Sequence, residues 1–291
     1  MTSLVQAWTA ARDRLKAAGI DTPVMDARLL VEAASGATRA DLLSDPQREL
    51  TQGQTADLDG YLARRERREP IAYILGRKGF WNLMLRVGPE VLTPRPDTET
   101  VVHAALEALP PDAAGRVLDL GVGSGAILLA VLHERPAAKG LGVDLSEEAL
   151  AVARDNAASL GLAGRTALLR GDWTTGLGDA TFDLVLANPP YIPSADIETL
   201  EPEVRQYEPR GALDGGPDGL DAYRVLAPEI LRVLAPGGAF VVEIGHDQGP
   251  AVRGLFAAAG AEELRVGKDL TGSDRIVAGR KKPLGITPYS R

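Results

Sequence analysis

The chain has 291 residues, a formal net charge of −8, 45% hydrophobic residues and no cysteine. This length corresponds to about two domains, and the hydrophobic content is sufficient for ordinary cores. The lack of cysteine excludes disulfide bonds and thiolate metal sites, and it favours a reducing compartment. The negative charge argues against a general polyphosphate-binding surface, which needs clustered Lys and Arg.

The amino terminus has the pattern of an amphipathic helix and not that of a signal peptide. Arg12, Arg14 and Lys16 follow its apolar positions instead of preceding them. The longest apolar stretch, residues 126–132, is too short to cross a bilayer. We therefore expect a cytoplasmic protein with no membrane contact.

The first 70 or so residues carry the apolar period of helices. Helices are expected from the amino terminus, after Thr22-Pro23, after Thr38 and around Leu58, the last ending before Pro70. A bridging stretch follows, in which the segments IAYILG and GFWNLML are expected to be short strands.

Four arginines lie close together near the end of the fourth expected helix: Arg64, Arg65, Arg67 and Arg68. They are interpreted as a solvated helix end whose cations offset the negative pole of the helix dipole. A docking patch for a partner is the less favoured alternative.

From Pro94 onwards, short apolar runs alternate with helical stretches. The runs are residues 117–120, 140–144, 167–172, 182–187 and 239–244. This succession predicts an α/β fold with a parallel, doubly wound sheet, because each strand must return by a right-handed crossover. Two further strands, at 264–266 and 275–277, are expected to form a hairpin through Gly272 at the sheet edge.

In such sheets a ligand lies beyond the carboxyl ends of the strands. The first strand is followed by a glycine-rich loop made of Gly121, Val122, Gly123, Ser124 and Gly125. Asp144 ends the second strand, where a carboxylate can accept both hydroxyls of a ribose, although a helix cap is an equally common role. Asp172 and Trp173 end the third strand and are candidates to contact a base, with a core role as the alternative for the tryptophan.

The fourth strand ends in Asn188-Pro189-Pro190-Tyr191. In a sheet of order 3-2-1-4-5 this tetrapeptide lies beside the glycine loop. Each proline fixes its own φ and holds the preceding residue extended, so the neighbouring carbonyls are aimed in advance. The side-chain oxygen of Asn188 and the backbone oxygen of Pro189 can accept two hydrogen bonds from one planar NH₂ group, with Tyr191 against its plane. An ordinary turn is the alternative.

The G-x-G-x-G spacing resembles the S-adenosylmethionine loop of Rossmann-like methyltransferases, which implies that Asp119 helps to order the loop and the methionine portion. An NAD-dependent dehydrogenase would more typically show G-x-G-x-x-G and a site for hydride transfer. The tetrapeptide resembles that of amino-methyltransferases acting on planar nitrogens. Such chemistry needs no general base, and His103, His133 and His246 have no convincing catalytic partner.

Nearly the whole chain resembles the peptide chain release factor glutamine N5-methyltransferases. The matching segments are residues 69–76, 79–81, 92–99, 117–127, 171–173, 188–192, 207–213, 218–220, 243–245 and 269–275. Val122 stands where the family more often has threonine, with its backbone amide unchanged. The roles of Arg95, Thr98 and Glu99 stay open between lining the methionine end and fixing an interdomain hinge.

This resemblance implies a helical substrate-docking domain at residues 1–72, a β-hairpin linker at 73–92, a seven-stranded Rossmann-like methyltransferase domain at 93–281 and a tail at 282–291. It implies that S-adenosylmethionine is the cofactor and that the Gly-Gly-Gln glutamine of class 1 release factors is methylated. We expect no metal site, and we expect a monomer. By this likeness residues 188–191 bind the glutamine, while residues 121–125, Asp144, Trp173 and Asn188 hold the cofactor.

Two other functional classes share part of this pattern. An adenine N6-methyltransferase acting on DNA or RNA would use the same pair of acceptors on a flipped base, but it would need a basic track for the nucleic acid. The net charge and the small helical region argue against it, so no direct nucleic-acid contact is expected. A binding module without activity conflicts with the intact tetrapeptide and glycine loop.

Overall fold

The computed structural model describes residues 2–283, and the chain divides into two compact units. The helical unit consists of residues up to Arg77 together with the later segment Glu201–Tyr207, and the sheet unit holds the remainder. The helical unit is therefore not one continuous stretch of sequence, because Glu201–Tyr207 returns to it from the later part of the chain. Most of the expected tail, residues 284–291, lies outside the described residues.

The helical unit contains the helices expected from the apolar period. They are α1 (Leu4–Ala17), α2 (Pro23–Ser35), α3 (Arg39–Ser44) and α4 (Gln52–Glu66), with two short helices, α5 (Ile71–Leu75) and α9 (Pro202–Tyr207). Capping boxes begin three of them, at Ser3, Thr38 and Thr51. Leu4, Leu15 and other apolar residues from α1, α2 and α4 form the core of this unit.

The prediction of a strand at IAYILG is wrong, because this segment forms α5. Pro70 precedes its first turn, and Gly76 ends it with a left-handed φ of 67°. Five apolar residues are too few to distinguish a strand from a helical turn by their period. The expected strands in the following segment are present as a two-stranded sheet of β1 (Arg77–Phe80) and β2 (Leu83–Arg86).

Three of the four arginines at the end of α4 form ion pairs within the helical unit. Arg65 is buried and lies 2.7 Å from Asp26 and 2.8 Å from Glu203 of α9, and Arg68 also pairs with Glu203. Arg64 pairs with Glu69. The interpretation as a solvated helix end is therefore wrong for Arg65, because its second partner comes from a segment far away in the sequence.

Within residues 2–283, seven strands form the large sheet in the order β5-β4-β3-β6-β7-β9-β8. Their bounds are β3 Arg116–Leu120, β4 Lys139–Asp144, β5 Thr166–Arg170, β6 Phe182–Ala187, β7 Leu234–Glu243, β8 Ala261–Lys268 and β9 Asp274–Lys281. The first five are parallel, and β9 pairs antiparallel with both β7 and β8. The expected order and the closing hairpin are confirmed.

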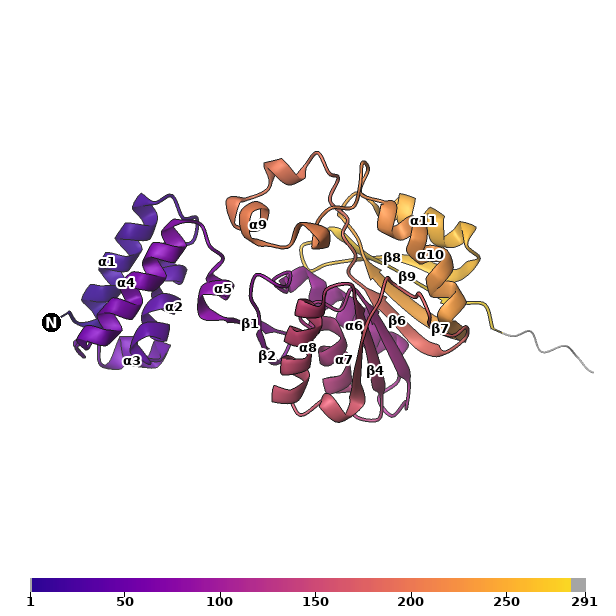
Figure 1. Ribbon diagram of the computed structural model, residues 1–291, viewed down its shortest axis with the longest axis horizontal. Helices are drawn as coiled ribbons and strands as arrows, with labels where there is room; N and C mark the ends of the chain where they lie inside the picture. Colours follow the sequence, from indigo (N-terminus) through magenta and orange to yellow (C-terminus); the bar gives the residue numbers. More distant parts are fainter. Residues whose placement is uncertain (1, 284–291) are drawn as a thin grey trace, which may run out of the picture. The chain divides into compact units, whose positions relative to one another are not determined.

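Helices cover both faces of this sheet (Figure 1). One face carries α6 (Glu99–Ala108), α7 (Ala126–Glu134) and α8 (Glu147–Ser159), and the other carries α10 (Asp221–Val233) and α11 (Gly249–Ala258). Short 3-10 turns complete the connections, at Pro96–Thr98, Ala163–Arg165, Ile197–Thr199 and Arg210–Ala212.

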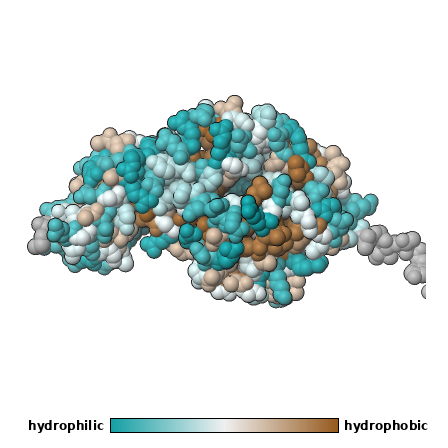
Figure 2. Space-filling view, in the orientation of Figure 1, coloured by the Kyte–Doolittle hydropathy of each residue, from teal (hydrophilic) through white to brown (hydrophobic). Residues whose placement is uncertain are grey.

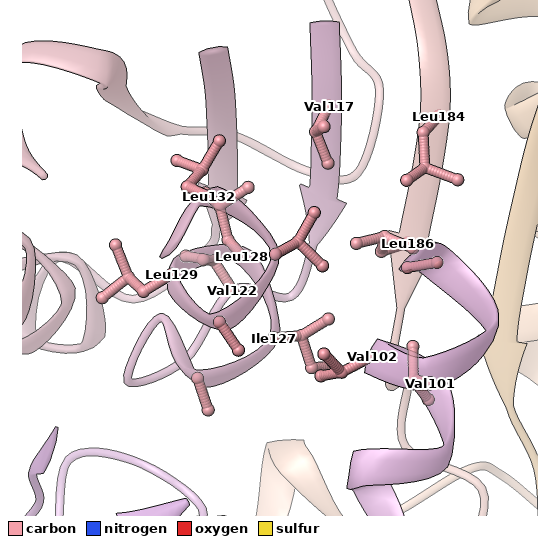
Figure 3. Close-up of a cluster of buried hydrophobic side chains, with 14 of the residues drawn as sticks. Val101, Val102, Val117, Val122, Ile127, Leu128, Leu129, Leu132, Leu184 and Leu186 are labelled. Atoms are coloured by element: carbon pink, nitrogen blue, oxygen red, sulfur yellow. The ribbon is translucent and has the colours of Figure 1, made fainter. Parts of the chain in front are cut away.

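Alternate residues of each strand enter two separate cores. In β3, Val117 faces the core of α6, α7 and α8, whereas Leu118 and Leu120 face α10 and α11. Figure 3 shows Val117, Leu184 and Leu186 of the sheet beside side chains of α6 and α7 in the first of these cores. Because burial on both faces sets the register, the strand ends at the ligand edge are held firmly.

Hydrophilic residues cover much of the visible surface, with hydrophobic residues gathered in a few patches (Figure 2). In the described part of the chain, no helix has the length and apolar character needed to span a membrane.

Arg65→Met is expected to lower the free energy of unfolding of the helical unit by about 3 kcal/mol, because it leaves the buried carboxylate of Asp26 without its cation. Urea denaturation followed by circular dichroism measures the change. The control is Arg67→Met, which alters an exposed side chain of the same helix end. Equal midpoints for the two variants would contradict a role of Arg65 as the internal counter-ion.

Candidate active site

The ends of four neighbouring strands, β5, β4, β3 and β6, border the candidate site. Leu120 of β3 pairs with Val143 of β4 on one side and with Ala187 of β6 on the other. The residues that follow, from Gly121 in the glycine loop to Asn188 in the tetrapeptide, therefore leave the sheet at the same edge. This is the adjacency expected from the strand order.

A cavity of about 290 Å³ lies at this edge, close to the lower end of the sizes typical of small-molecule sites. Its walls include residues 121–124 of the glycine loop, Asp144, Trp173 and Asn188. These predicted site residues come from four different strand ends, and the fold brings them together.

The glycine loop turns sharply away from β3. Gly121, Gly123 and Gly125 have φ values of 74°, 52° and 83°, in the left-handed region that favours glycine. A Cβ on Gly125 would also lie only 2.9 Å from Cδ1 of Leu129, so the loop packs directly on the first turns of α7. The second position of the loop, Val122, is buried and contributes to the cavity wall.

Asp144 fastens the middle of this loop. Its Oδ2 accepts a hydrogen bond from the backbone N–H of Gly123 at 2.9 Å, and its Oδ1 accepts one from Ser146 N–H at 3.0 Å. The side chain that caps α8 is that of Ser146, which accepts from Ala149 N–H. Each carboxylate oxygen of Asp144 keeps a second lone pair, so the group can still accept from a ligand at the cavity wall.

Asp119 lies beneath the loop and is 1% exposed. Its Oδ2 accepts from the backbone N–H of Leu128 in the first turn of α7, at 3.2 Å. Burial raises its pKa to about 7, opposed by the Leu128 hydrogen bond and reinforced by the charge of Asp144. Its Oδ1 has no hydrogen-bond partner within residues 2–283, so a buried acceptor is left for a cationic group.

Trp173 and Asp172 have different positions. The Trp173 ring lies over the loop, because a Cβ on Gly121 would be 3.6 Å from its Cζ3, and the residue adopts a φ of 49° that is rare for a bulky side chain. Such strain persists where the surroundings demand it, often at a functional site. Asp172 is exposed and is not part of the cavity wall.

Asn188 and Pro190 line the cavity, while Pro189 is buried behind them. The side-chain amide of Asn188 donates from Nδ2 to Oγ1 of Thr98 at 3.5 Å, a long hydrogen bond. In this orientation Oδ1 is the atom that remains available as an acceptor.

The backbone of the tetrapeptide is held tightly from behind. The carbonyl oxygen of Tyr191 accepts from Nε2 of Gln248 at 2.9 Å. A Cβ on Gly215 would lie 2.8 Å from Cα of Tyr191, and one on Gly219 would lie 2.4 Å from its carbonyl oxygen. The glycines therefore permit a close approach that fixes the position of the motif.

The hydroxyl of Tyr191 points at the buried carboxyl group of Glu243, a residue for which the sequence predicted no role. The hydroxyl donates to Oε1 of Glu243 at 3.2 Å, and burial followed by the charge of Glu243 raises the pKa of Tyr191 far above its usual value. Tyr191 therefore remains a donor. The sequence feature that could have indicated this contact is an acidic residue inside the apolar run at the end of β7. No comparable sequence feature indicated that Gln248 contacts the tetrapeptide.

Arg95, Thr98 and Glu99, whose roles the sequence left open, have different positions in the structure. Arg95 lines the cavity and pairs with the buried carboxyl of Glu208 at 2.7 Å. Thr98 also lines the cavity, next to its hydrogen-bond partner Asn188. Glu99 accepts the backbone N–H of Trp81 in the turn between β1 and β2, at 2.8 Å.

The histidines do not reach the cavity. His103, His133 and His246 are all exposed, and none of them forms part of its wall. His103 packs edge-on against Trp81 instead.

Two family models match the chain: the PrmC N-terminal domain over residues 6–76, and a methyltransferase domain over residues 111–260. The release factor glutamine methyltransferase of Caulobacter vibrioides is 65% identical over 97% of this chain and 98% of its own. The chain belongs to the release factor glutamine methyltransferase family. A further member, from Rhodospirillum rubrum, is 46% identical over 94% of this chain and 84% of its own.

As a member of this family the protein is a methyltransferase. A solved methyltransferase structure from Pyrococcus furiosus matches with a TM-score of 0.52 and 18% identity, covering 77% of this chain and 99% of that one. This likeness supports the fold assignment of the sheet unit.

Asp119→Asn is expected to stabilise the ligand-free protein increasingly as the pH rises from about 4 to about 7. A buried carboxyl with a raised pKa favours folding while it is protonated, and this advantage is lost as the pH rises through the folded-state pKa. The difference in unfolding free energy from the parent should grow by about 1 kcal/mol or more.

Urea titrations at several pH values measure this difference. The control is Asp172→Asn, which alters an exposed carboxyl outside the cavity wall. A difference for Asp119→Asn that does not grow with pH would show that its carboxyl ionises in the folded protein as it does in the unfolded chain.

Proposed function

We propose that this methyltransferase transfers a methyl group from S-adenosylmethionine to the side-chain amide nitrogen of the Gly-Gly-Gln glutamine in class 1 peptide chain release factors. The observation that carries the proposal is one cavity bounded by both the glycine loop and Asn188. The names of its relatives give the substrate class, since the Caulobacter vibrioides member is a release factor glutamine methyltransferase.

The residues around the glycine loop fit S-adenosylmethionine. The unpartnered oxygen of buried Asp119 suits the ammonium of the methionine portion, and Asp144 at the end of β4 suits the ribose hydroxyls. The ring of Trp173 offers an apolar face for the adenine. When bound, S-adenosylmethionine supplies an electrophilic methyl carbon attached to a positively charged sulfur.

Asn188 and Pro189 would bind the acceptor glutamine. Asn188 Oδ1 and the Pro189 carbonyl oxygen accept the two hydrogens of the planar amide, and the ring of Tyr191 packs against its plane. An amide nitrogen is a poor nucleophile because its lone pair is delocalised into the carbonyl group. Holding both hydrogens favours the geometry in which this pair points at the methyl donor.

The proposed reaction needs no general base. Once the nitrogen is methylated, the amide is cationic and loses its proton to water without assistance. The exposed positions of His103, His133 and His246 are consistent with this, since a base would have to reach the acceptor nitrogen.

The same proposal includes the protein partner, the cellular location and the oligomeric state. A class 1 release factor is the protein partner, the helical unit contributes to docking it, and the enzyme acts as a cytoplasmic monomer. Incubation with labelled S-adenosylmethionine and either a release factor or DNA tests the substrate class. Label on the release factor supports the proposal, and label on DNA would favour adenine methylation instead.

Asn188→Ala is expected to retain the fold and to lower kcat by about 10²- to 10³-fold, the usual effect of removing one preorganised hydrogen-bonding group. Transfer of labelled methyl to a release factor measures the loss. Asn82→Ala, which alters an exposed asparagine outside the cavity, should retain normal turnover. Near-normal methylation by Asn188→Ala would remove the role of the amide acceptor.

Asp144→Ala is expected to weaken binding of S-adenosylmethionine by roughly tenfold or more, because it removes two acceptors from the cavity wall and releases the N–H of Gly123. Isothermal calorimetry measures the affinity. Asp155→Ala, on the exposed side of α8, provides the matched control. Unchanged affinity in Asp144→Ala would restrict this carboxylate to ordering the loop and helix.

A further inference from the structure

Glu243 lies directly behind the tetrapeptide, at the end of β7. Glu243 is 1% exposed and does not line the cavity. Tyr191 donates its hydroxyl to Oε1 of Glu243 at 3.2 Å, while Tyr223 donates to the backbone oxygen of Glu243 at 2.7 Å. The carboxyl group is therefore held in place and contacts the motif from outside the cavity wall.

Thr98 connects the same carboxyl group to the other end of the motif. The residue is 4% exposed, and its Oγ1 accepts from Nδ2 of Asn188 at 3.5 Å. Its side chain also lies beside Glu243, where it acts to lower the pKa of that carboxyl group. The second carboxyl oxygen, Oε2, is buried and has no hydrogen-bond partner within residues 2–283. An ionised Glu243 thus has unfilled acceptor capacity beside Thr98.

The direction of this chain of hydrogen bonds follows from the atoms involved. A carboxylate accepts but cannot donate, and a hydroxyl has a single proton. An ionised Glu243 would therefore take the proton of Thr98, while Thr98 accepts from Asn188. This turns the NH₂ group of Asn188 towards Thr98 and leaves Oδ1 for the substrate. The reverse orientation would place an NH₂ group against the NH₂ of the acceptor amide.

We propose that Glu243 is a positioning residue for the proposed glutamine methylation, on which this inference rests. It anchors the hydroxyl of Tyr191 and, through Thr98, keeps the Asn188 amide in its accepting orientation. Glu243 acts through these three residues and does not touch the substrate.

The charge state of Glu243 should be visible in the pH dependence. Burial raises the pKa of Glu243 to about 7, opposed by hydrogen bonding from Thr98, by the charge of Arg275 and by the Tyr191 hydroxyl, and reinforced by the charge of Asp97. Arg275 of β9 also pairs with Asp97 and Asp269, at 3.4 and 3.2 Å. Tyr223 of α10 completes the set of titratable groups around the carboxyl.

Protonated Glu243 can itself donate to Thr98, and Thr98 is then free to donate to Asn188. The constraint on the amide is lost in that form. Methyl transfer should therefore increase as the pH rises through about 7.

The test compares Glu243→Gln and Thr98→Val with the full-length parent, using labelled S-adenosylmethionine and a release factor. Gln has the shape of Glu but can donate, and Val removes the hydroxyl that connects the two groups. Both variants should lower kcat at pH 8 by roughly 10- to 100-fold, as expected when a reacting group is misplaced. Both should also lose the rise in kcat between pH 6 and pH 8.

Two further readouts separate positioning from a general structural role. In Glu243→Gln the affinity for S-adenosylmethionine should stay within about twofold of the parent, because Glu243 does not line the cavity. The double variant should be no slower than the slower single one, since both changes interrupt one chain. Glu262→Gln, an exposed carboxyl of β8, should keep the parental kcat and pH profile.

A Glu243→Gln variant with the kcat and pH profile of the parent would overturn the proposal. So would a loss of cofactor affinity that matches the loss of activity, or additive effects in the double variant. Failure of the parent enzyme itself to methylate a release factor is a different result, because it contradicts the proposed function and not the role of Glu243.

Discussion

The parallel pairing of β3 with β6 is the constraint on which the site depends. It places Leu120 opposite Ala187, so the glycine loop and the tetrapeptide leave the sheet as neighbours. Alternate residues of these strands are buried on both faces, which prevents a shift in register. A shift of one residue would exchange the two faces and would separate the proposed cofactor contacts from the proposed amide acceptors.

The rigidity of the motif comes from several independent sources. The prolines restrict φ, Gly215 and Gly219 allow close backbone contact, and Gln248 binds the carbonyl of Tyr191. A site organised in this way needs little rearrangement when charge develops on the reacting atoms. The buried carboxyls of Asp119 and Glu243 lie behind the glycine loop and the tetrapeptide respectively, where they are shielded from water.

Local sequence patterns were sufficient to predict the sheet order, the closing hairpin and the grouping of Gly121, Asp144 and Asn188. These features depend on strand ends, which apolar runs and glycines mark clearly. The segment IAYILG was mistaken for a strand because five apolar residues have no diagnostic period. The partner of Arg65 and the contact between Tyr191 and Glu243 depend on residues distant in the sequence, and no local pattern encodes such pairings.

The central claim is that Asn188 and Pro189 accept the two hydrogens of the glutamine amide. A crystal structure of the protein with S-adenosylhomocysteine and a peptide containing the acceptor glutamine tests it most directly. We expect the amide nitrogen to lie within hydrogen-bonding distance of both Asn188 Oδ1 and the Pro189 carbonyl oxygen, facing the sulfur. An amide bound elsewhere, or Asn188 presenting its NH₂ group to the substrate, would contradict these roles of Asn188 and Pro189.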